Sequence, residues 1–386
     1  MITRTLHASS IKKIIQRIDN CLVDGFKPSL AFIYASSTFN IEKLAGKLLS
    51  YDFYILGATT AGEVYANAMD GVHEVDDSIV CMLIEVNSDA LAFTSMEIEG
   101  KNSYDVGVSI GLWANKCFKE SSIITLTSGL AFDNDAYVQG ILSQGVEYIF
   151  GGVAGDGVRL LKTFVFSHGH YSNNGIVVLA MDKQIIDVVG ARAFGWAGIG
   201  KERIVTHSDK NIVYKIDGKS AIDFYKNYLN IGVTDMPQIG IEYPLEVRMR
   251  NGQIIYRAVL EIDEEKGALI FAGHVEENAR VRISAPKGKS IIQDVSKSIP
   301  EVLDKAVAFK PEVALVFPCC SRKQVLGYLT SLEIEAVYNA SKVPLIGFFA
   351  YGEIGAFPGG YGFHNETFVT MFLSERRVDS CLKIEP

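Results

Sequence analysis

The sequence predicts an α/β protein with α+β features, in which two modules are built from repeated strand–helix–strand units and an antiparallel β-rich segment lies in the middle. Two observations support this prediction. The stretch at 28–64 returns in the same order at 311–354, and a weaker copy occupies 123–179. Between 188 and 271, short apolar runs alternate with turn residues, which is typical of antiparallel strands. Strand–helix–strand units need helices over at least one face of their sheet, and this favours α/β layering.

The N-terminal segment, 1–27, is expected to be mainly a helix, because apolar residues recur at helical spacing over 9–22 behind a serine at a plausible N-cap. The first copy then predicts a strand, a helix and two strands, at 30–34, 41–49, 53–56 and 78–85. The last copy predicts the same series at 313–317, 322–340, 344–346 and 367–373. The weaker copy predicts it at 123–127, 136–142, 148–150 and 175–179.

The middle segment predicts antiparallel strands and one helix. The strands are expected at 188–195, 212–216, 245–249, 254–260 and 268–271, and the helix at 220–229. The chain is therefore divided into an N-terminal helix at 1–27 and two domains at 28–220 and 221–386.

Composition narrows the classes of function. The chain of 386 residues has a net charge of -8 (37 basic against 45 acidic) and lacks a Lys/Arg cluster, so binding of a nucleic-acid backbone is disfavoured. It has no apolar run long enough for a transmembrane helix and no secretory leader at its start, so we expect no membrane association. Its six cysteines match no disulfide or zinc spacing, and a reduced, cytoplasmic setting is expected.

The repeated loop offers a candidate binding site. In two copies a strand runs into Gly-x-x-x-x-Gly-Glu, at 57–63 and 347–353, which combines exposed backbone N–H groups with one carboxylate. Such a loop could hold a small polar ligand, or its glycines could serve only close strand packing and its glutamate could cap backbone N–H groups. In the weaker copy the acid is Asp156, at a different spacing. The candidate residues of these loops are Thr60, Gly62, Glu63, Tyr351, Gly352 and Glu353.

Further candidates surround the last copy of the loop. The first strand there ends in Cys319-Cys320, with Arg322 beyond, so a low-pKa thiol beside a cation is one reading and a buried apolar cysteine is the other. Arg322 could pair with a ligand carboxylate or internally with Glu353. Next to the last strand stand His364 and Asn365, and the histidine could equally be a hydrogen-bonded structural residue.

In sum these stretches resemble the FIST family of sensory domains, with FIST N and FIST C parts covering roughly 28–375. The resemblance rests on ILGATTAGEV, IFGGVAGDG, FGWAGIGKERIVTHSDKNIVYKIDGKSAIDFYKNYL, CCSRKQVLGYLTSLEIEA, PLIGFFAYGEIGAF and HNETFVTMFL, and on their order along the chain. It implies a cytoplasmic, non-catalytic sensor that binds a small, amino acid-like ligand and acts on a separate signalling partner such as a histidine kinase. It also implies that Cys319, Arg322, Gly352 and Glu353 form the family-typical cluster, with Gly62 and Glu63 as counterparts.

Two alternatives stay open. Some free-standing members that this chain resembles are haem proteins that sense nitric oxide, and this reading makes haem a candidate cofactor bound through a histidine. None of the seven histidines can be assigned as the axial ligand from the sequence. The other alternative is an enzyme that uses the Cys319 or Cys320 thiol. If only one copy of the loop binds the signal, we expect it to be the last copy, at 347–353.

Overall fold

The computed structural model describes residues 1–376, except 129, 131, 231, 233–235, 287–289 and 359. The last ten residues of the predicted domain 221–386 therefore lie outside the described residues. Within the described part of the chain, no helix is both long and apolar enough to cross a membrane.

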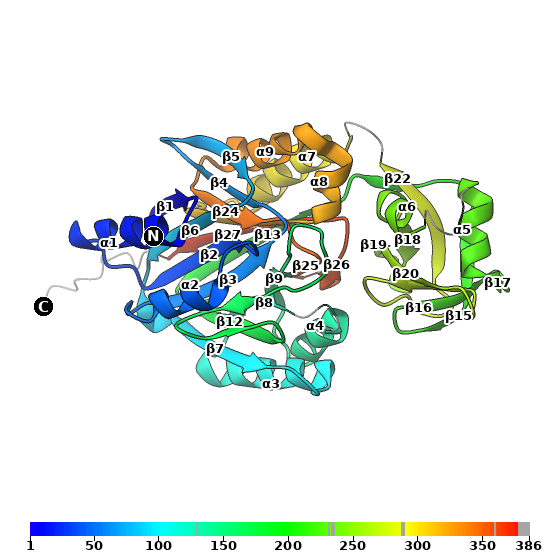
Figure 1. The fold of residues 1–386 in the computed structure, drawn as a ribbon, viewed down its shortest axis with the longest axis horizontal. Coiled ribbons are helices and arrows are strands. Elements are labelled where there is room, and N and C mark those ends of the chain that lie inside the picture. The colour runs from blue at the N-terminus through cyan, green and yellow to red at the C-terminus, as the bar shows by residue number, and fades with distance from the viewer. Residues whose placement is uncertain are drawn as a thin grey trace, which may run out of the picture.

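The predicted α/β class is confirmed, and the repeated unit occurs three times, each time with its own sheet (Figure 1). The first unit contains β1 (Ile2–Ala8), α1 (Ile11–Val23), β2 (Leu30–Ser36), α2 (Ile41–Leu48), β3 (Tyr54–Thr60), β4 (Glu63–Asn67), β5 (Gly71–Val75) and β6 (Ile79–Glu85). The second contains η1 (Ser88–Ala90), β7 (Leu91–Glu97), α3 (Ser103–Cys117), β8 (Ser121–Thr127), α4 (Asn134–Leu142), β9 (Tyr148–Val153), β10 (Val165–Phe166), β11 (Tyr171–Ser172) and β12 (Gly175–Asp182). The third contains β13 (Ile186–Ala193), α7 (Ser290–Lys305), β23 (Val313–Pro318), α8 (Cys320–Leu326), η3 (Gly327–Leu329), α9 (Ser331–Ser341), β24 (Leu345–Phe348), β25 (Glu353–Ala356), β26 (Phe363–His364) and β27 (Phe368–Glu375). The weaker copy of the sequence is thus a complete unit.

The three sheets have the same strand order. In each unit the first strand lies at one edge, followed by the last, the second and the third, as in β1-β6-β2-β3, β7-β12-β8-β9 and β13-β27-β23-β24. The second and third strands are parallel and the others antiparallel. All residues of β2, β8 and β23 are buried, which explains the nearly continuous apolar runs of β2 and β23, and β8 buries serine and threonine side chains among its apolar ones. One face of each sheet meets the other sheets in a shared core, and the other face carries the unit's helices.

Each unit gives a hairpin to a neighbouring sheet. Strand β4 pairs with β24, β25 pairs with β9, and β10 pairs with β3, so the exchange closes a ring. At the crossing points, backbone N–H groups bond to carbonyls of the next unit: Ala61 to Phe349 (3.0 Å), Tyr351 to Val153 (3.1 Å) and Gly155 to Thr59 (2.8 Å). The repeated loops therefore meet one another at the centre of the molecule.

The first glycine of the loop is required by close strand packing. A Cβ atom at Gly347 would lie 2.0 Å from the carbonyl oxygen of Val316, and one at Gly151 would lie 1.7 Å from that of Thr125. These contacts are shorter than any a side chain could make, so the packing reading of this glycine holds.

An inserted module follows β13 and returns to the core at α7, and it stands beside the three units in Figure 1. It comprises β14 (Trp196–Gly198), β15 (Arg203–Asp209), β16 (Ile212–Ile216), β17 (Lys219–Ser220), α5 (Ala221–Leu229), α6 (Met236–Glu242), β18 (Leu245–Arg248), β19 (Ile254–Arg257), β20 (Val259–Asp263), β21 (Ala268–Phe271) and β22 (Arg280–Pro286). Its strands form one antiparallel sheet over an apolar core of its own. The expected boundary at 220 falls inside this module, where Ser220 caps α5.

Three sequence expectations change in the structure. The segment 1–27 contains α1 as expected, capped by Ser10, but Ile2–Ala8 forms strand β1 along β6. The strand expected at 188–195 is β13, which pairs with β27 of the third unit and not with the inserted module. The helix expected at 322–340 is broken at Gly327, because a φ of 53° there ends α8.

Candidate functional site

Two neighbouring cavities lie where β2, β8 and β23 reach their carboxyl ends, which is where α/β sheets usually bind ligands. The first cavity, of about 480 Å³, is lined by Ser36, Thr38, Thr60, Ala61, Gly62, Glu63, Asp76, Asp77, Gly157, Val158, Arg159, Cys320, Lys323 and Gln324. The second cavity, of about 120 Å³, is lined by Leu130, Phe132, Asn134, Val153, Val158, Leu160, Ile241, Ala258, Leu260, Ala272, Cys319, Cys320, Ser321, Gln324, Tyr351, Phe363, Asn365 and Glu366. Val158, Cys320 and Gln324 border both cavities.

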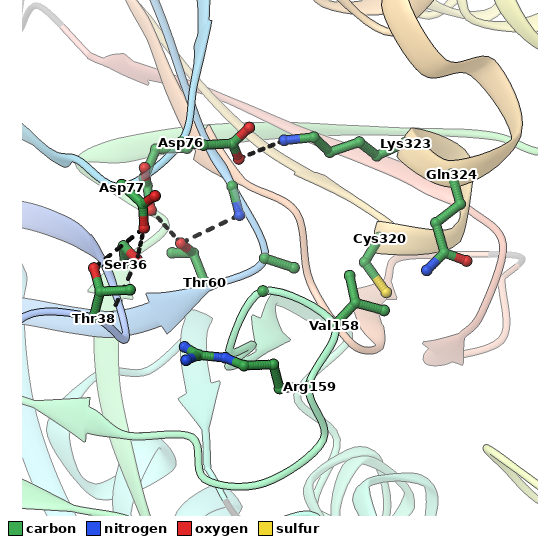
Figure 2. A pocket seen from close by; sticks show the side chains of 14 residues that line it. Ser36, Thr38, Thr60, Asp76, Asp77, Val158, Arg159, Cys320, Lys323 and Gln324 are labelled. Atoms are coloured by element: carbon green, nitrogen blue, oxygen red, sulfur yellow. Dashed lines mark hydrogen bonds and ion pairs between the residues drawn. The ribbon is translucent and has the colours of Figure 1, made fainter.

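The first cavity is polar, and its polar groups bind one another (Figure 2). The buried Glu63 carboxyl accepts hydrogen bonds from the hydroxyls of Thr60 and of Ser78, the latter at 2.7 Å. Burial raises the pKa of Glu63 to about 7. Near Glu63, Lys323 Nζ lies 2.6 Å from Asp76 Oδ1. Gly62 is needed here, since its φ is 133° and a Cβ atom would lie 2.7 Å from Lys323 Nζ.

The pairing register shows which residues of the units correspond. Glu63 pairs with Phe348 and Glu353 with Gly152, and each partner directly follows the first glycine of its loop. In the second unit, the residue paired at this position is Val165, opposite Ala58. The expectation that Asp156 is the acid of the weaker copy is therefore wrong, because residues 156–163 are an excursion that the other loops lack.

A second pair of acids is also related by the repeat. Asp77 and Glu366 both stand two residues before the closing strand of their unit, and both have left-handed backbones, with φ of 47° and 59°. Asp77 accepts a hydrogen bond from Thr38 at 3.2 Å, and Glu366 accepts one from Ser321 at 2.5 Å. The two cavities are therefore built on the same plan.

The second cavity differs from the first, because some of the buried acceptor atoms in and behind its wall receive no hydrogen bond from the described residues. The Ser321 hydroxyl lies 2.5 Å from Glu366 Oε2 and 2.9 Å from the Cys319 sulfur. Three atoms, Glu366 Oε1, Asn365 Oδ1 and Glu353 Oε1, have no hydrogen-bond partner among the described residues. Glu353 lies behind the cavity wall against the Cys319 thiol, and its other oxygen accepts the Thr367 N–H at 3.1 Å.

These acids and the thiol favour their protonated forms. Burial raises the pKa of Glu366 to about 8, and burial next to the Cys319 sulfur holds the pKa of Glu353 well above its ordinary value. Burial also raises the pKa of the Cys319 thiol well above 9.0. This is the opposite of the depressed pKa that a nucleophilic cysteine needs, so the geometry around Cys319 matches the buried, apolar reading of this residue.

Arg322 does not reach either cavity wall. It is fully buried, and its guanidinium binds Glu333 through Nη2 at 2.5 Å. Nη1 donates to the carbonyl of Glu366 at 2.8 Å and to that of Phe194 in the segment that leads to the inserted module. The internal ion pair expected from the sequence exists, but its acid is Glu333 and not Glu353. Arg322 thus fixes the backbone that carries Glu366.

Tyr351 connects the second cavity to the excursion at 156–163. Its hydroxyl donates to Asp156, whose carboxylate also accepts the backbone N–H groups of residues 159–162. These bonds outweigh burial and lower the pKa of Asp156. They also hold Val158 at a φ of 67°, which is strained for a β-branched residue, so that Val158 separates the two cavities. Gly352 lies behind this wall, where a Cβ atom would lie 2.6 Å from the Phe363 ring.

His364 lies in the core and not on a cavity wall. Its Nε2 is 2.6 Å from the Tyr361 carbonyl oxygen and 3.3 Å from Arg192 Nη1, and burial holds its pKa well below 6.5. Among the described residues no histidine lines either cavity, so these cavities do not supply the axial histidine that haem would need. The described residues also contain no cluster of three or more His, Cys, Asp or Glu side chains that could hold a metal ion.

The inserted module forms the far wall of the second cavity with Ile241, Ala258, Leu260 and Ala272. Next to this wall, the buried Arg257 pairs with Asp135 of α4 at 2.8 Å. His274 Nε2 lies 2.8 Å from Asp133 Oδ2, and hydrogen bonding to that carboxylate outweighs burial and raises the pKa of His274. The two modules are therefore held together beside the cavity.

The sequence reasoning missed Ser321 and Glu366 as well as the whole wall from the inserted module. A signal for the acid was present, because Asp76-Asp77-Ser78 and Asn365-Glu366-Thr367 precede equivalent strands. The wall residues are ordinary apolar side chains, and only the tertiary structure brings them to the site.

The fold and the two cavities define a class of protein in which interlocked α/β units place small-molecule-sized cavities at the ends of their strands. Comparison with known families identifies the family to which the chain belongs. The FIST N domain matches residues 29–219 and the FIST C domain matches 221–356. The chain belongs to the FIST family, whose domains are sensory domains of signal-transduction proteins and are not a catalytic family.

The chain is also similar to two curated proteins of Mycobacterium tuberculosis. They are the uncharacterized protein MT0656 of strain CDC 1551 / Oshkosh and the uncharacterized protein Rv0628c of strain ATCC 25618 / H37Rv. Each is 23% identical over 230 residues, which cover 57% of this chain and 59% of the relative. The similarity thus spans somewhat over half of each protein.

Proposed function

We propose that this chain is the ligand-binding part of a cytoplasmic signalling system. A small molecule binds in the second cavity, and the chain, itself non-catalytic, acts on a separate output protein such as a histidine kinase. The observation that carries this proposal is that the second cavity has walls from both the three-unit core and the inserted module.

The two-sided wall supplies a physical route from binding to signalling. A ligand that contacts Leu260 and Ala272 on one side and Glu366 on the other stabilises the arrangement in which both walls are in place. A ligand shifts a conformational equilibrium only by its difference in affinity between states, and contacts to two modules provide such a difference. The output partner would then bind with different affinities to the arrangement in which both walls are in place and to the arrangement in which they are apart.

The proposal is tested by thermal unfolding of the purified protein against a broad panel of amino acids, amines and other metabolites. A compound that binds only the folded state raises the melting temperature. The variant Ala272→Phe places a ring in the second cavity and should abolish the shift. The control Ala68→Phe, at an exposed site in the turn after β4, should keep it. A panel without a single hit, or hits that persist in Ala272→Phe, would remove the support for this function.

A further inference from the structure

The second cavity contains hydrogen-bond acceptors without matching donors. Asn365 and Glu366 both line it, both are at most 1% exposed, and Asn365 Oδ1 and Glu366 Oε1 have no hydrogen-bond partner among the described residues. A buried acceptor left without a donor costs about 1–3 kcal/mol. Two such atoms on one cavity wall indicate a ligand group that donates several hydrogen bonds.

The same cavity has no counterpart for an anion. Among its described lining residues there is no lysine, arginine or histidine, and the nearby Arg322 is bound to Glu333. The first cavity is different, since Lys323 and Arg159 stand on its walls and hydroxyl groups already bind Glu63. A ligand carboxylate would therefore be buried without a cationic partner in the second cavity, which is unfavourable.

Most of the remaining lining of the second cavity is apolar, and Asn134, Ser321, Gln324 and Tyr351 add polar groups to it. The apolar side chains come from the second unit, the third unit and the inserted module: Leu130, Phe132, Val153, Ile241, Leu260 and Phe363. Small-molecule sites usually combine such a lining with a few polar groups that fix the orientation of the ligand. Here the polar groups lie on the core side and the apolar surface extends toward the inserted module.

We propose that the ligand of the second cavity is an apolar primary amine, whose ammonium group binds Glu366 and Asn365 and which carries no carboxylate. This inference rests on the proposed function and deepens it, because it names the class of ligand. Because the proposed ligand carries no carboxylate, it differs from the amino acid-like ligands that the family resemblance implies. The ammonium group has three donors, which suits the unused carboxylate and amide oxygens.

Binding of the amine should depend on pH. The charged and titratable groups near the Glu366 carboxyl are Cys319 and Arg322 of the α8 segment, Glu353 of β25 and Tyr225 of α5. Because burial raises the pKa of Glu366 to about 8, the carboxyl is mostly protonated at neutral pH in the free protein. The ammonium group requires the ionised form, so binding releases a proton and tightens as the pH rises from about 6 to about 8.

The experiment is isothermal titration calorimetry of the full chain with 2-phenylethylamine, phenylalanine and 2-phenylethanol, followed by the smaller set of isopentylamine, leucine and isopentanol. We expect an amine to bind at least about tenfold more tightly than its amino acid and its alcohol. An amino acid that binds as tightly as its amine, or a set in which no amine binds, overturns the inference. In either case hits elsewhere in the metabolite panel would leave the proposed sensory function intact.

Matched variants assign the binding to this wall. Glu366→Gln should weaken amine binding at least about tenfold, and Asn365→Leu, which removes the second acceptor, should also weaken it. Asp77→Asn changes the acid at the equivalent repeat position, which lines the first cavity, and it should leave the affinity for the amine unchanged. Circular dichroism verifies that each variant is folded, and Asn365→Leu decides the matter if Glu366→Gln does not fold. Unchanged affinity in a folded variant of either residue contradicts the inference.

Discussion

Replacing Glu366 with glutamine should make the stability of the fold less dependent on pH. The carboxyl is fully buried and its pKa is raised from 4.5 to about 8. The folded state therefore holds a proton that the unfolded chain gives up near its ordinary pKa. An acid with a raised pKa stabilises the fold below the unfolded value, and this contribution is lost as the pH rises toward 8.

The magnitude follows from the separation of the two pKa values. They differ by about 3.5 pH units (8 minus 4.5), and each unit corresponds to about 1.4 kcal/mol. The pH-dependent contribution of Glu366 to the free energy of unfolding is therefore at most about 5 kcal/mol. Most of this change, about 3 kcal/mol, falls between about pH 5.5 and pH 8.5. Glutamine cannot ionise, so the variant should lack this loss.

The assay is urea unfolding of the wild-type chain and of Glu366→Gln at both pH values, with the exposed Glu99→Gln as the control. Other groups contribute to the pH dependence of both proteins, so the relevant quantity is the difference between wild type and variant. The reasoning fails if the free energies of unfolding of wild type and Glu366→Gln change in parallel between the two pH values.

Three further predictions concern the packing and the module contacts. Gly347→Ala places a Cβ atom 2.0 Å from a carbonyl oxygen and should destabilise the fold by more than about 3 kcal/mol in urea unfolding. Gly46→Ala, in α2 with no atom within 4 Å, should stabilise it by about 0.5–1 kcal/mol, and equal effects would contradict the packing argument. Arg257→Met leaves Asp135 buried without its partner and should destabilise by about 3–5 kcal/mol, so a loss below about 1 kcal/mol would argue against a structural ion pair. The pKa of His274 is raised above 6.5 in the folded state, so its protonated form stabilises the fold below pH 6.5. This stabilisation is lost as the pH rises through the pKa of the folded state. His274→Gln should therefore show a smaller drop in melting temperature between about pH 6 and pH 8 than wild type.

The strands and most helices of the repeats could be predicted from the sequence because their signals are local. The strands at 30–34 and 313–317 are continuous apolar runs and form β2 and β23, and 123–127, which alternates in part with threonine, forms β8. Helix α3 was missed, because its Gly107 and Gly111 are poor helix formers that serve close packing against α4.

The exchange of hairpins could not be predicted, because it depends on pairing between distant segments. Nothing within 63–67 indicates that β4 lies beside β24 and not beside β3. The same holds for the candidate site. The loop residues Gly352 and Glu353 stand out in the sequence, whereas the partner of Arg322 and the wall from the inserted module appear only once the chain is folded.

Hydrogen–deuterium exchange measured with and without a bound ligand tests the central claim most directly. With 2-phenylethylamine or any hit from the metabolite panel, a ligand in the second cavity should slow amide exchange in two places at once. One is the core side, at 319–324 and 363–367, and the other is the inserted module, at 258–260 and 270–273. Slower exchange confined to one module, or protection centred on the first cavity at 60–63 and 76–78, would contradict a sensory site shared by the two modules.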